Sequence, residues 1–255
     1  MAHKTLIGGT AYEIKGGKTL IGGTGYEISG GKTLVGGTGY DVKFGTPIGS
    51  LPVGSTVYFN VNGAKKAFIV IHQGLPSADY DASCNGTWLL IKDIYEKRQF
   101  HSSNASGNFY TSALATYMNG TILGLIDSDV RAHIKSVSIP CRTYANRLNN
   151  HPFQIFLLSG VEIGFTKATT NDYLSEEGSC LSYFSGATAA TRIAYLDGTA
   201  QAWWIRSARL DNANYAFTVR ATGTNVFATT SSNANIGVRP AFVLPSEFDV
   251  TNYLS

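Results

Sequence analysis

Two short apolar runs near the C-terminal end of the sequence constrain the fold more than any other feature. The first is W-W-I-R-S over residues 203–207, which we call the front frame. The second is G-V-R-P-A-F-V-L-P over residues 237–245, which we call the back frame. Each frame combines large apolar side chains with a single arginine, a composition typical of a buried strand whose cation finds a partner. The residues to which we assign structural roles are Trp203, Trp204, Arg206 and Arg239.

The segment between the frames consists of Asn, Ser, Thr, Ala and Gly with scattered Tyr, Phe and Arg. Such a composition is typical of recognition surfaces such as antibody loops, and a plain solvated hairpin is the alternative. From residue 205 to residue 236 there is no Lys, Glu, Gln, Met or Trp. Codons that end in a pyrimidine cannot encode these five residue types. Asn codons end in a pyrimidine, and mutagenesis that changes only their adenines keeps that ending. Such mutagenesis would therefore produce a segment without these types.

We predict that the exposed side chains of this segment contact a ligand. Tyr215 and Phe227 would supply rigid apolar anchors, because aromatic side chains bury much area with little rotamer freedom. Arg209 and Arg220 would supply forked donors to carboxylates or sugar hydroxyls. Since alternate side chains of a strand face opposite ways, part of the set would face the core. The predicted contact residues are Arg209, Asp211, Asn212, Asn214, Tyr215, Arg220, Thr222, Thr224, Asn225, Phe227, Thr229, Ser231, Asn233 and Asn235.

The two frames resemble the C-terminal region of variable proteins that are diversified by retroelements. Upstream, the runs I-H-Q-G (71–74), S-C-N-G-T-W-L-L (83–90) and F-L-L-S-G (156–160) are similar to a domain common in Gram-positive bacteria and their phages, which ends in the same G-V-R-P run. The resemblance extends over residues 45–245. It implies a C-type-lectin-like fold and a place in phage tails or on bacterial surfaces, although a fold does not by itself fix a function.

Composition argues against several classes of partner. The formal net charge is only +3 and no basic cluster is present, so we expect no nucleic-acid partner. No apolar run approaches the length of a membrane span and the N-terminus lacks a signal-peptide apolar region, so we expect no membrane insertion. Cys84, Cys141 and Cys180 lie far apart and cannot all pair. We predict that they are small buried side chains rather than a disulfide framework.

The first 45 residues contain a 14-residue repeat. The run that begins at Lys4 returns at Lys18 and at Lys32, and each copy has two β-prone runs separated by Gly-Gly pairs. We predict one small β-hairpin per copy, and a meander or stacked spiral for the three copies. One copy buries too little apolar surface to offset backbone ordering at roughly 1–2 kcal/mol per residue. Residues 1–45 are therefore expected to form an all-β stem that assembles with neighbouring chains, as a homotrimer; a flexible linker is the alternative.

Residues 46–255 indicate a second, ligand-binding domain with strands early and late in the sequence. The runs 56–61 and 67–72 flank Asn62-Gly63 and predict a hairpin. Further strands are predicted over 88–91, 154–158 and 238–244, and a hairpin is predicted from 202–207 and 215–220.

Two helices are expected between these strands. The first runs from Tyr110 to Asn119 and ends at Gly120. The second is capped by Asp127 and runs to about Lys135, with Val130, His133 and Ile134 facing inward. Two helices beside short antiparallel strands predict an α+β domain of the C-type-lectin-like class.

The sequence offers little support for catalysis. It contains no H-E-x-x-H, G-x-S-x-G, phosphate-loop or paired-cysteine metal motif. Glu176-Glu177 lies in a polar run and is predicted to form a solvated turn. The E-P-N, Q-P-D and W-N-D triplets of calcium-dependent lectins are absent, which argues against a metal-bridged sugar site. We predict no catalytic residue, no metal and no cofactor.

These features predict a receptor-binding protein at a phage tail tip, where several copies would turn weak contacts into avidity. The expected partners are a host cell-surface protein or glycan and other tail proteins, and the bacterial cell surface is the alternative location. One alternative function is a structural tail component whose polar segment is buried between subunits. A less favoured alternative is an enzyme related to formylglycine-generating oxidases, which would need two closely placed thiols and a cleft with clustered titratable groups.

Overall fold

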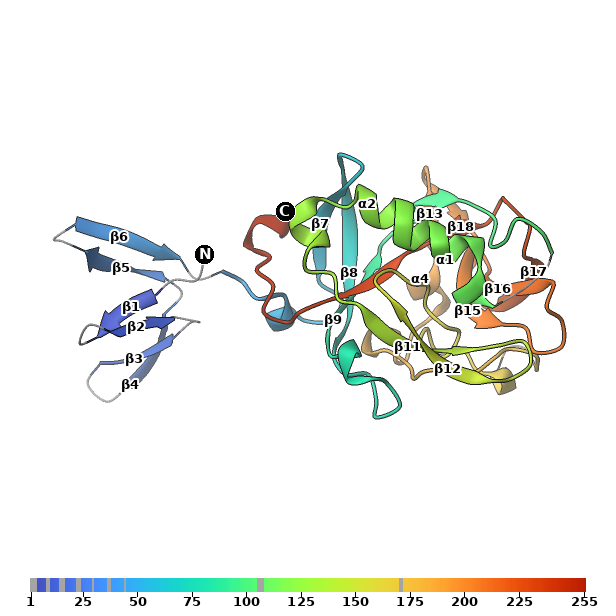
Figure 1. The fold of residues 1–255 in the computed structure, drawn as a ribbon, viewed down its shortest axis with the longest axis horizontal. Coiled ribbons are helices and arrows are strands. Elements are labelled where there is room, and N and C mark those ends of the chain that lie inside the picture. The colour runs from blue at the N-terminus through green and yellow to red at the C-terminus, as the bar shows by residue number, and fades with distance from the viewer. Residues whose placement is uncertain are drawn as a thin grey trace. The chain divides into compact units, whose positions relative to one another are not determined.

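The computed structural model describes residues 4–7, 10–13, 17–21, 24–28, 30–35, 38–43, 45–104, 108–169 and 172–255. The chain divides into two compact units, residues 1–46 and residues 47–255 (Figure 1). Each unit is described by itself.

Each copy of the 14-residue repeat forms one antiparallel hairpin, as predicted. The three hairpins share one register, since their innermost pairs are Ile7↔Thr10, Ile21↔Thr24 and Val35↔Thr38. In the described residues each hairpin is a separate two-stranded sheet and no strand of one copy pairs with the next, so the predicted meander is wrong, whereas the predicted stacked spiral stays a prediction. An isolated two-stranded hairpin is marginally stable. The strands are β1 (Lys4–Ile7), β2 (Thr10–Glu13), β3 (Gly17–Ile21), β4 (Thr24–Ile28), β5 (Gly30–Val35) and β6 (Thr38–Lys43).

The described residues of the unit 47–255 form two larger β-sheets and two two-stranded ribbons. A four-stranded sheet has the order β19-β9-β8-β7, and a five-stranded sheet has the order β10-β18-β15-β16-β17. All neighbours are antiparallel except β15 and β18. The sheet strands are β7 (Thr56–Val61), β8 (Ala64–Gly74), β9 (Gly86–Ile91), β10 (Glu96–Lys97), β15 (Trp203–Ala208), β16 (Tyr215–Val219), β17 (Val226–Thr230), β18 (Gly237–Val238) and β19 (Ala241–Leu244). The ribbons pair β11 (Val137–Arg142) with β12 (Leu148–Phe153) and β13 (Ala194–Leu196) with β14 (Thr199–Gln201).

The predicted α+β, C-type-lectin-like domain with two helices is wrong. The structure is mostly β, with 35% of residues in strands and 19% in helices, and one helical segment is seven residues or longer. This segment consists of α1 (Ala113–Tyr117), a π-helical turn (Met118–Ile122) and α2 (Leu123–Leu125). The predicted terminator Gly120 lies inside the π turn. Asn119 stabilises the continuation, because its Nδ2 donates to the Ile155 carbonyl at 2.7 Å and its Oδ1 accepts from the Gln154 amide at 3.0 Å.

The second predicted helix shrinks to one turn, α3 (Ser128–Arg131). Asp127 does not cap it, because its carboxylate accepts a hydrogen bond from Asn60 Nδ2 at 2.9 Å instead. Val130 and Ile134 are buried as predicted, but His133 is exposed. The remaining helical elements are α4 (Ala189–Arg192) and the 3-10 turns Ile48–Ser50, Ala82–Cys84, Phe109–Thr111, Lys167–Thr169, Ser182–Phe184 and Thr251–Tyr253.

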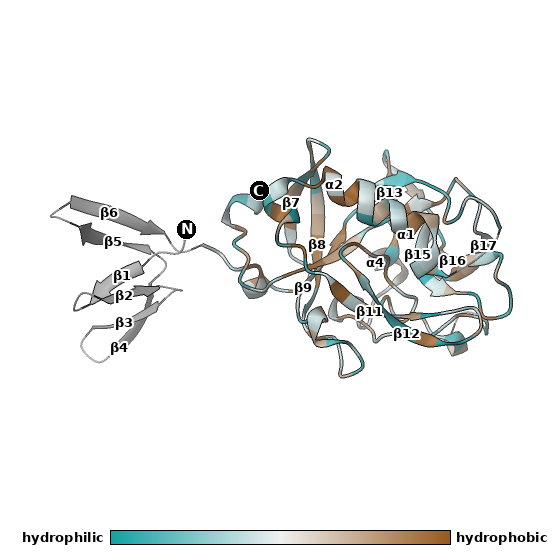
Figure 2. Ribbon diagram, viewed as in Figure 1, coloured by the Kyte–Doolittle hydropathy of each residue, from teal (hydrophilic) through white to brown (hydrophobic). Residues whose placement is uncertain are grey.

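The first hairpin and its neighbours form the apolar centre of the four-stranded sheet. Asn62 and Gly63 have φ values of 54° and 70°, the left-handed pair that a two-residue type I′ turn requires. All residues of β9 are buried, and Trp88 packs edge-on against Phe156 with ring centres 5.3 Å apart. Figure 2 shows hydrophobic residues along β8 and β9, whereas the loops around β16 and β17 are hydrophilic.

The back frame crosses from one sheet to the other. Its first strand, β18, belongs to the five-stranded sheet, and its second, β19, pairs with β9 in the four-stranded sheet. Arg239 and Pro240 lie between the two strands. The predicted single strand over 238–244 is therefore interrupted. The predicted strand over 154–158 is reduced to one bridge between Phe156 and Ala241.

Candidate functional site

The front frame is held rigidly inside the domain, as the sequence predicts. All six residues of β15 are buried. The indole N–H of Trp203 donates to the Arg192 carbonyl at 3.0 Å, and that of Trp204 donates to the Arg98 carbonyl at 2.7 Å. Because buried Trp N–H groups are satisfied, these rings fill the core without an energetic penalty for a lost hydrogen bond.

Arg239 of the back frame lies at the crossover between the sheets. Its Nε donates to the Ile91 carbonyl at 3.0 Å and its Nη2 donates to the Lys92 carbonyl at 2.8 Å. The guanidinium stands 5.0 Å from the centre of the Trp203 ring. Burial lowers the pKa of Arg239 to about 10. The residue ties the two sheets together through carbonyl oxygens and is not open to a ligand.

Arg206 of the front frame forms a fully buried ion pair with Glu162. Both guanidinium nitrogens Nη1 and Nη2 lie 2.5 Å from the two carboxylate oxygens. Glu162 also accepts from the Tyr80 hydroxyl at 2.6 Å and from the Ser159 amide at 2.9 Å. Burial by itself would lower the pKa of Arg206, but the adjacent Glu162 carboxylate outweighs it and holds the pKa above its ordinary value. The pair is a structural element of the core.

The cysteines are free in the structure. Cys84 and Cys141 are buried, and burial raises their thiol pKa values to about 11 and about 12. Since the thiolate is the reactive form, these two side chains behave as small apolar groups, as predicted. Cys180 is exposed, so the prediction of burial is wrong for this residue.

Glu177 also departs from expectation, because it is 2% exposed rather than part of a solvated turn. Its neighbour Glu176 is exposed, as predicted. One oxygen of the Glu177 carboxylate accepts from the Ser207 hydroxyl at 3.0 Å. Burial raises the pKa of Glu177 to about 7, and Arg206 opposes this shift.

We expect Glu177 to make folding stability depend on pH. Its folded pKa of about 7 lies above the ordinary value of 4.5, so its contribution is most favourable below pH 4.5 and is lost as pH rises through about 7. The Glu177→Gln variant should therefore be more stable than the wild type at pH 8 and nearly equal to it at pH 5. Urea denaturation at both pH values measures this difference. An equal gap between the two proteins at pH 8 and pH 5 would contradict the assignment.

The structure buries two of the predicted contact residues and leaves the others partly or fully exposed. Thr229 and Ser231 are buried, and their hydroxyls bond to Thr218 Oγ1 at 3.3 Å and to the Ser103 carbonyl at 3.1 Å. Neither side chain is open to a ligand in this conformation. Those that are exposed are Asp211, Asn214, Arg220, Thr222, Thr224 and Asn235; those that are partly exposed are Arg209, Asn212, Tyr215, Asn225, Phe227 and Asn233.

Arg209 is the centre of an ordered, exposed cluster. Its Nε and Nη2 donate to the two carboxylate oxygens of Asp211 at 2.5 and 3.0 Å. The guanidinium lies 5.3 Å from the ring centre of Tyr173 and 5.1 Å from that of Tyr215. Hydrogen bonding to Asp211 raises the pKa of Arg209, and the same bond lowers the pKa of Asp211. We call these four side chains the Arg209 cluster.

Tyr173 is the member of this cluster that the sequence did not predict. It stands in a polar run upstream of the front frame, with no feature that sets it apart. Two contacts bring it to the end of β15: Leu210 N donates to the Tyr173 carbonyl at 2.9 Å, and Ser175 N donates to the Ala208 carbonyl at 3.0 Å. Tyr173 is 46% exposed and is one of the large hydrophobic residues at the surface.

A second exposed group lies at the other end of β16. The Arg220 guanidinium stacks 4.8 Å from the ring centre of Phe227, and the hydroxyls of Thr222 and Thr224 bond to each other at 2.9 Å. The strand rise of about 3.3 Å per residue separates Tyr215 from Arg220 by roughly 17 Å. The predicted contact residues therefore form two groups rather than one patch.

Three of the predicted asparagines shape the turns. Backbone amides donate to the side-chain oxygens of Asn212 at 2.9 Å, Asn225 at 2.7 Å and Asn233 at 2.9 Å. Such local bonds are the usual reason that Asn occurs in turns. The side chains of these residues therefore stabilise the turns rather than projecting toward a ligand.

The family described as the domain of unknown function DUF6273 matches residues 85–246, more than half of the chain. The chain belongs to the DUF6273 family. Neither the curated proteins nor the solved structures contain a match to it. The DUF6273 span contains both frames and the Arg209 cluster, whereas the β7–β8 hairpin and the repeat lie outside it.

The described residues were also searched for metal-ligating clusters and for membrane-spanning helices. Within the part of the chain that is described, no three His, Cys, Asp or Glu side chains come together in a way that could hold a metal ion. Nor does any helix there have the length and apolar character needed to cross a membrane.

Proposed function

We propose that this protein is a ligand-binding protein and that the Arg209 cluster, with the exposed turns around β16 and β17, is its contact surface. The carrying observation is the arrangement of Arg209, which is paired with Asp211 and lies 5.3 Å from the Tyr173 ring centre and 5.1 Å from that of Tyr215. Tyr and Arg are among the residue types enriched at the hot spots of protein interfaces. Because the arginine is already ordered, binding would lose less side-chain entropy than it would with a free side chain.

The buried frames support this proposal. Front-frame and back-frame strands are fixed in the core, so the loops between them can change their exposed residues without disturbing the sheet. We further propose that the repeat assembles several copies, that the contact surface varies between copies of the gene, and that the protein acts at a phage tail tip or cell surface. The target would be a protein or glycan.

Sequencing codons 205–236 in many copies from one population tests the proposal directly. Substitutions should concentrate at partly or fully exposed positions such as Arg209, Asp211, Asn214 and Arg220. They should avoid the buried Thr229 and Ser231, which serve as internal controls within the same window. Variation that is as low at the exposed positions as in the two frames would refute a variable binding surface. The protein would then fit the alternative of a structural component packed against neighbouring subunits.

A stability measurement separates a binding surface from a structural one. The double variant Tyr173→Ala/Arg209→Ala should change the free energy of unfolding by no more than about 1 kcal/mol, because both side chains lie at the surface. Chemical denaturation checks this. A loss of several kcal/mol would mean that the cluster holds the loop to β15 and is not free to evolve for binding.

A further inference from the structure

A serine and a histidine that are distant in the sequence meet at the surface of the domain. Ser182 Oγ lies 2.8 Å from His72 Nδ1, although 110 positions separate the two residues. Ser182 is exposed and His72, near the end of β8, is partly buried, so the hydroxyl is open to solvent. Neither residue belongs to the Arg209 cluster, and the pair is therefore independent of the proposed function.

The hydrogen bonds of this pair define where its protons are. The backbone amide of Ser182 also donates to His72 Nδ1, at 3.3 Å. An amide can only donate, so Nδ1 carries a lone pair, and the ring proton of the neutral imidazole is on Nε2. The Ser182 hydroxyl is then the donor in its own bond to Nδ1. Burial lowers the pKa of His72, while hydrogen bonding to the Leu75 backbone and the charge of Glu162 oppose the shift. His72 is therefore mostly neutral at pH 7 and able to accept a proton from Ser182.

The turn that carries Ser182 is fixed on both sides. Leu181 before the serine and Phe184 at the end of the 3-10 turn are 0% and 1% exposed. The Leu181 amide donates to the Glu162 carbonyl at 3.0 Å, and the Phe184 amide donates to the Leu181 carbonyl at 2.9 Å. The Tyr183 amide, by contrast, has no acceptor among the described residues. An unpaired N–H directly after a nucleophilic serine is a donor of the kind that stabilises an oxyanion.

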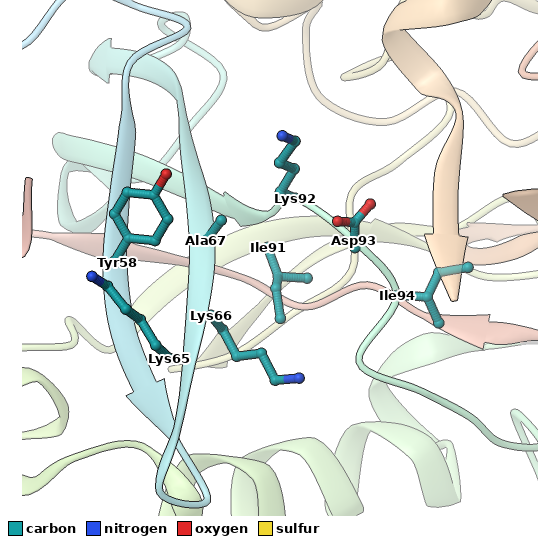
Figure 3. A pocket seen from close by; sticks show the side chains of 8 residues that line it. All are labelled: Tyr58, Lys65, Lys66, Ala67, Ile91, Lys92, Asp93 and Ile94. Atoms are coloured by element: carbon teal, nitrogen blue, oxygen red, sulfur yellow. The ribbon is translucent and has the colours of Figure 1, made fainter. Parts of the chain in front are cut away.

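Figure 3 shows a contrasting arrangement elsewhere along β8. A hollow of about 340 Å³ there is lined by Lys66 and Lys92, among other residues. Their ammonium groups extend away from each other, so one ligand cannot engage both (Figure 3). His72 and Ser182 do converge, and chemistry is therefore assigned to them rather than to the hollow.

We propose that Ser182 is a nucleophile activated by His72 and that the pair hydrolyses carboxylic esters. Ser182 Oγ bonds to the carbonyl carbon of the ester while its proton passes to His72 Nδ1. The Tyr183 amide donates to the carbonyl oxygen as it becomes negative. The bond to the alcohol then breaks, and the alcohol leaves with the proton from Nδ1. Water next gives a proton to Nδ1 and bonds to the acyl carbon. The bond between the acyl carbon and Oγ breaks, the acid leaves, and Ser182 regains its proton.

Ester hydrolysis and covalent labelling of the full chain test the proposal. The protein should hydrolyse p-nitrophenyl acetate, and a fluorophosphonate should label Ser182, with fluoride leaving as the bond between phosphorus and Oγ forms. Peptide mass spectrometry locates the label. Ser182→Ala should abolish both reactions. His72→Gln should slow both by at least about 100-fold, because a positioned general base typically contributes a factor of roughly 10²–10⁴.

Ser185→Ala is the matched control, because Ser185 is also exposed and directly follows the same turn. It should leave both reactions unchanged. Hydrolysis by Ser182→Ala at the wild-type rate, a label only at other residues, or a wild type that does not react would each overturn the proposal. Wild-type rates in His72→Gln would show that the histidine only holds the turn and would overturn it as well. Ser182→Ala removes a single exposed oxygen atom, so it decides the question even if His72→Gln does not fold.

Discussion

Replacing Glu162 with Gln should lower the free energy of unfolding by about 3–5 kcal/mol, the usual result of removing one partner from a buried ion pair. The loss arises because Arg206 stays in the core without a compensating charge: both side chains of the pair are 0% exposed. Glu162 also accepts from Tyr80 and Ser159, so a neutral amide cannot satisfy all its present donors. Urea denaturation monitored by tryptophan fluorescence measures the change.

The surface pair Arg209–Asp211 provides the control, because its shortest N–O distance is also 2.5 Å. Its side chains are 25% and 34% exposed. Asp211→Asn should therefore cost no more than about 1 kcal/mol, since water screens exposed pairs and solvates the remaining partner. Similar losses for Glu162→Gln and Asp211→Asn would mean that burial is not what makes the inner pair important.

Gly223→Ala should destabilise the domain by about 2–5 kcal/mol, from backbone strain and steric overlap together. Gly223 has a φ of +70°, where side chains are strained. A Cβ there would stand 2.1 Å from the carbonyl oxygen of Ala189, which is backbone and cannot rotate away. The turn between β16 and β17 would have to move away from α4. Chemical denaturation checks the prediction.

Gly186→Ala separates the two causes. Gly186 has the same φ of +70°, but an added Cβ would meet nothing within 4 Å. This variant should cost only the backbone strain, about 1–2 kcal/mol. Equal losses at Gly186 and Gly223 would show that the close approach to Ala189 contributes nothing.

The hairpins could be predicted from the sequence, because the residues that form them are neighbours in the chain. The Asn62-Gly63 hairpin was predicted from its turn residues, and the pairing of β15 with β16 from two strand-like runs that flank a polar turn; both are present. The two-helix fold class failed for a tertiary reason. Asn119 bonds to residues 154–155 and so stabilises the helix beyond Gly120. Asp127 does not cap the second helix, because its carboxylate bonds to Asn60, which is distant in the sequence.

The candidate site was predictable only in part, for a similar reason. Arg209 and Tyr215 stand in the polar segment between the frames and could be selected by composition. Tyr173 joins them through backbone bonds to Leu210, a contact between distant segments that composition does not reveal. Glu177 illustrates the converse: its polar neighbours indicated solvent, yet the fold turns it toward Ser207.

The crossing of the back frame between the sheets has a consequence for biosynthesis. In the four-stranded sheet, β9 lies between β8 and β19, and Thr87 pairs with Leu244. While the ribosome makes the intervening chain, one edge of this strand, which is fully buried in the folded domain, has no partner. Unpaired strand edges favour association with other chains, and pairings between distant residues form slowly. The nascent protein thus carries an aggregation risk until β19 has emerged, and ribosomal pausing before Gly237 would prolong that risk.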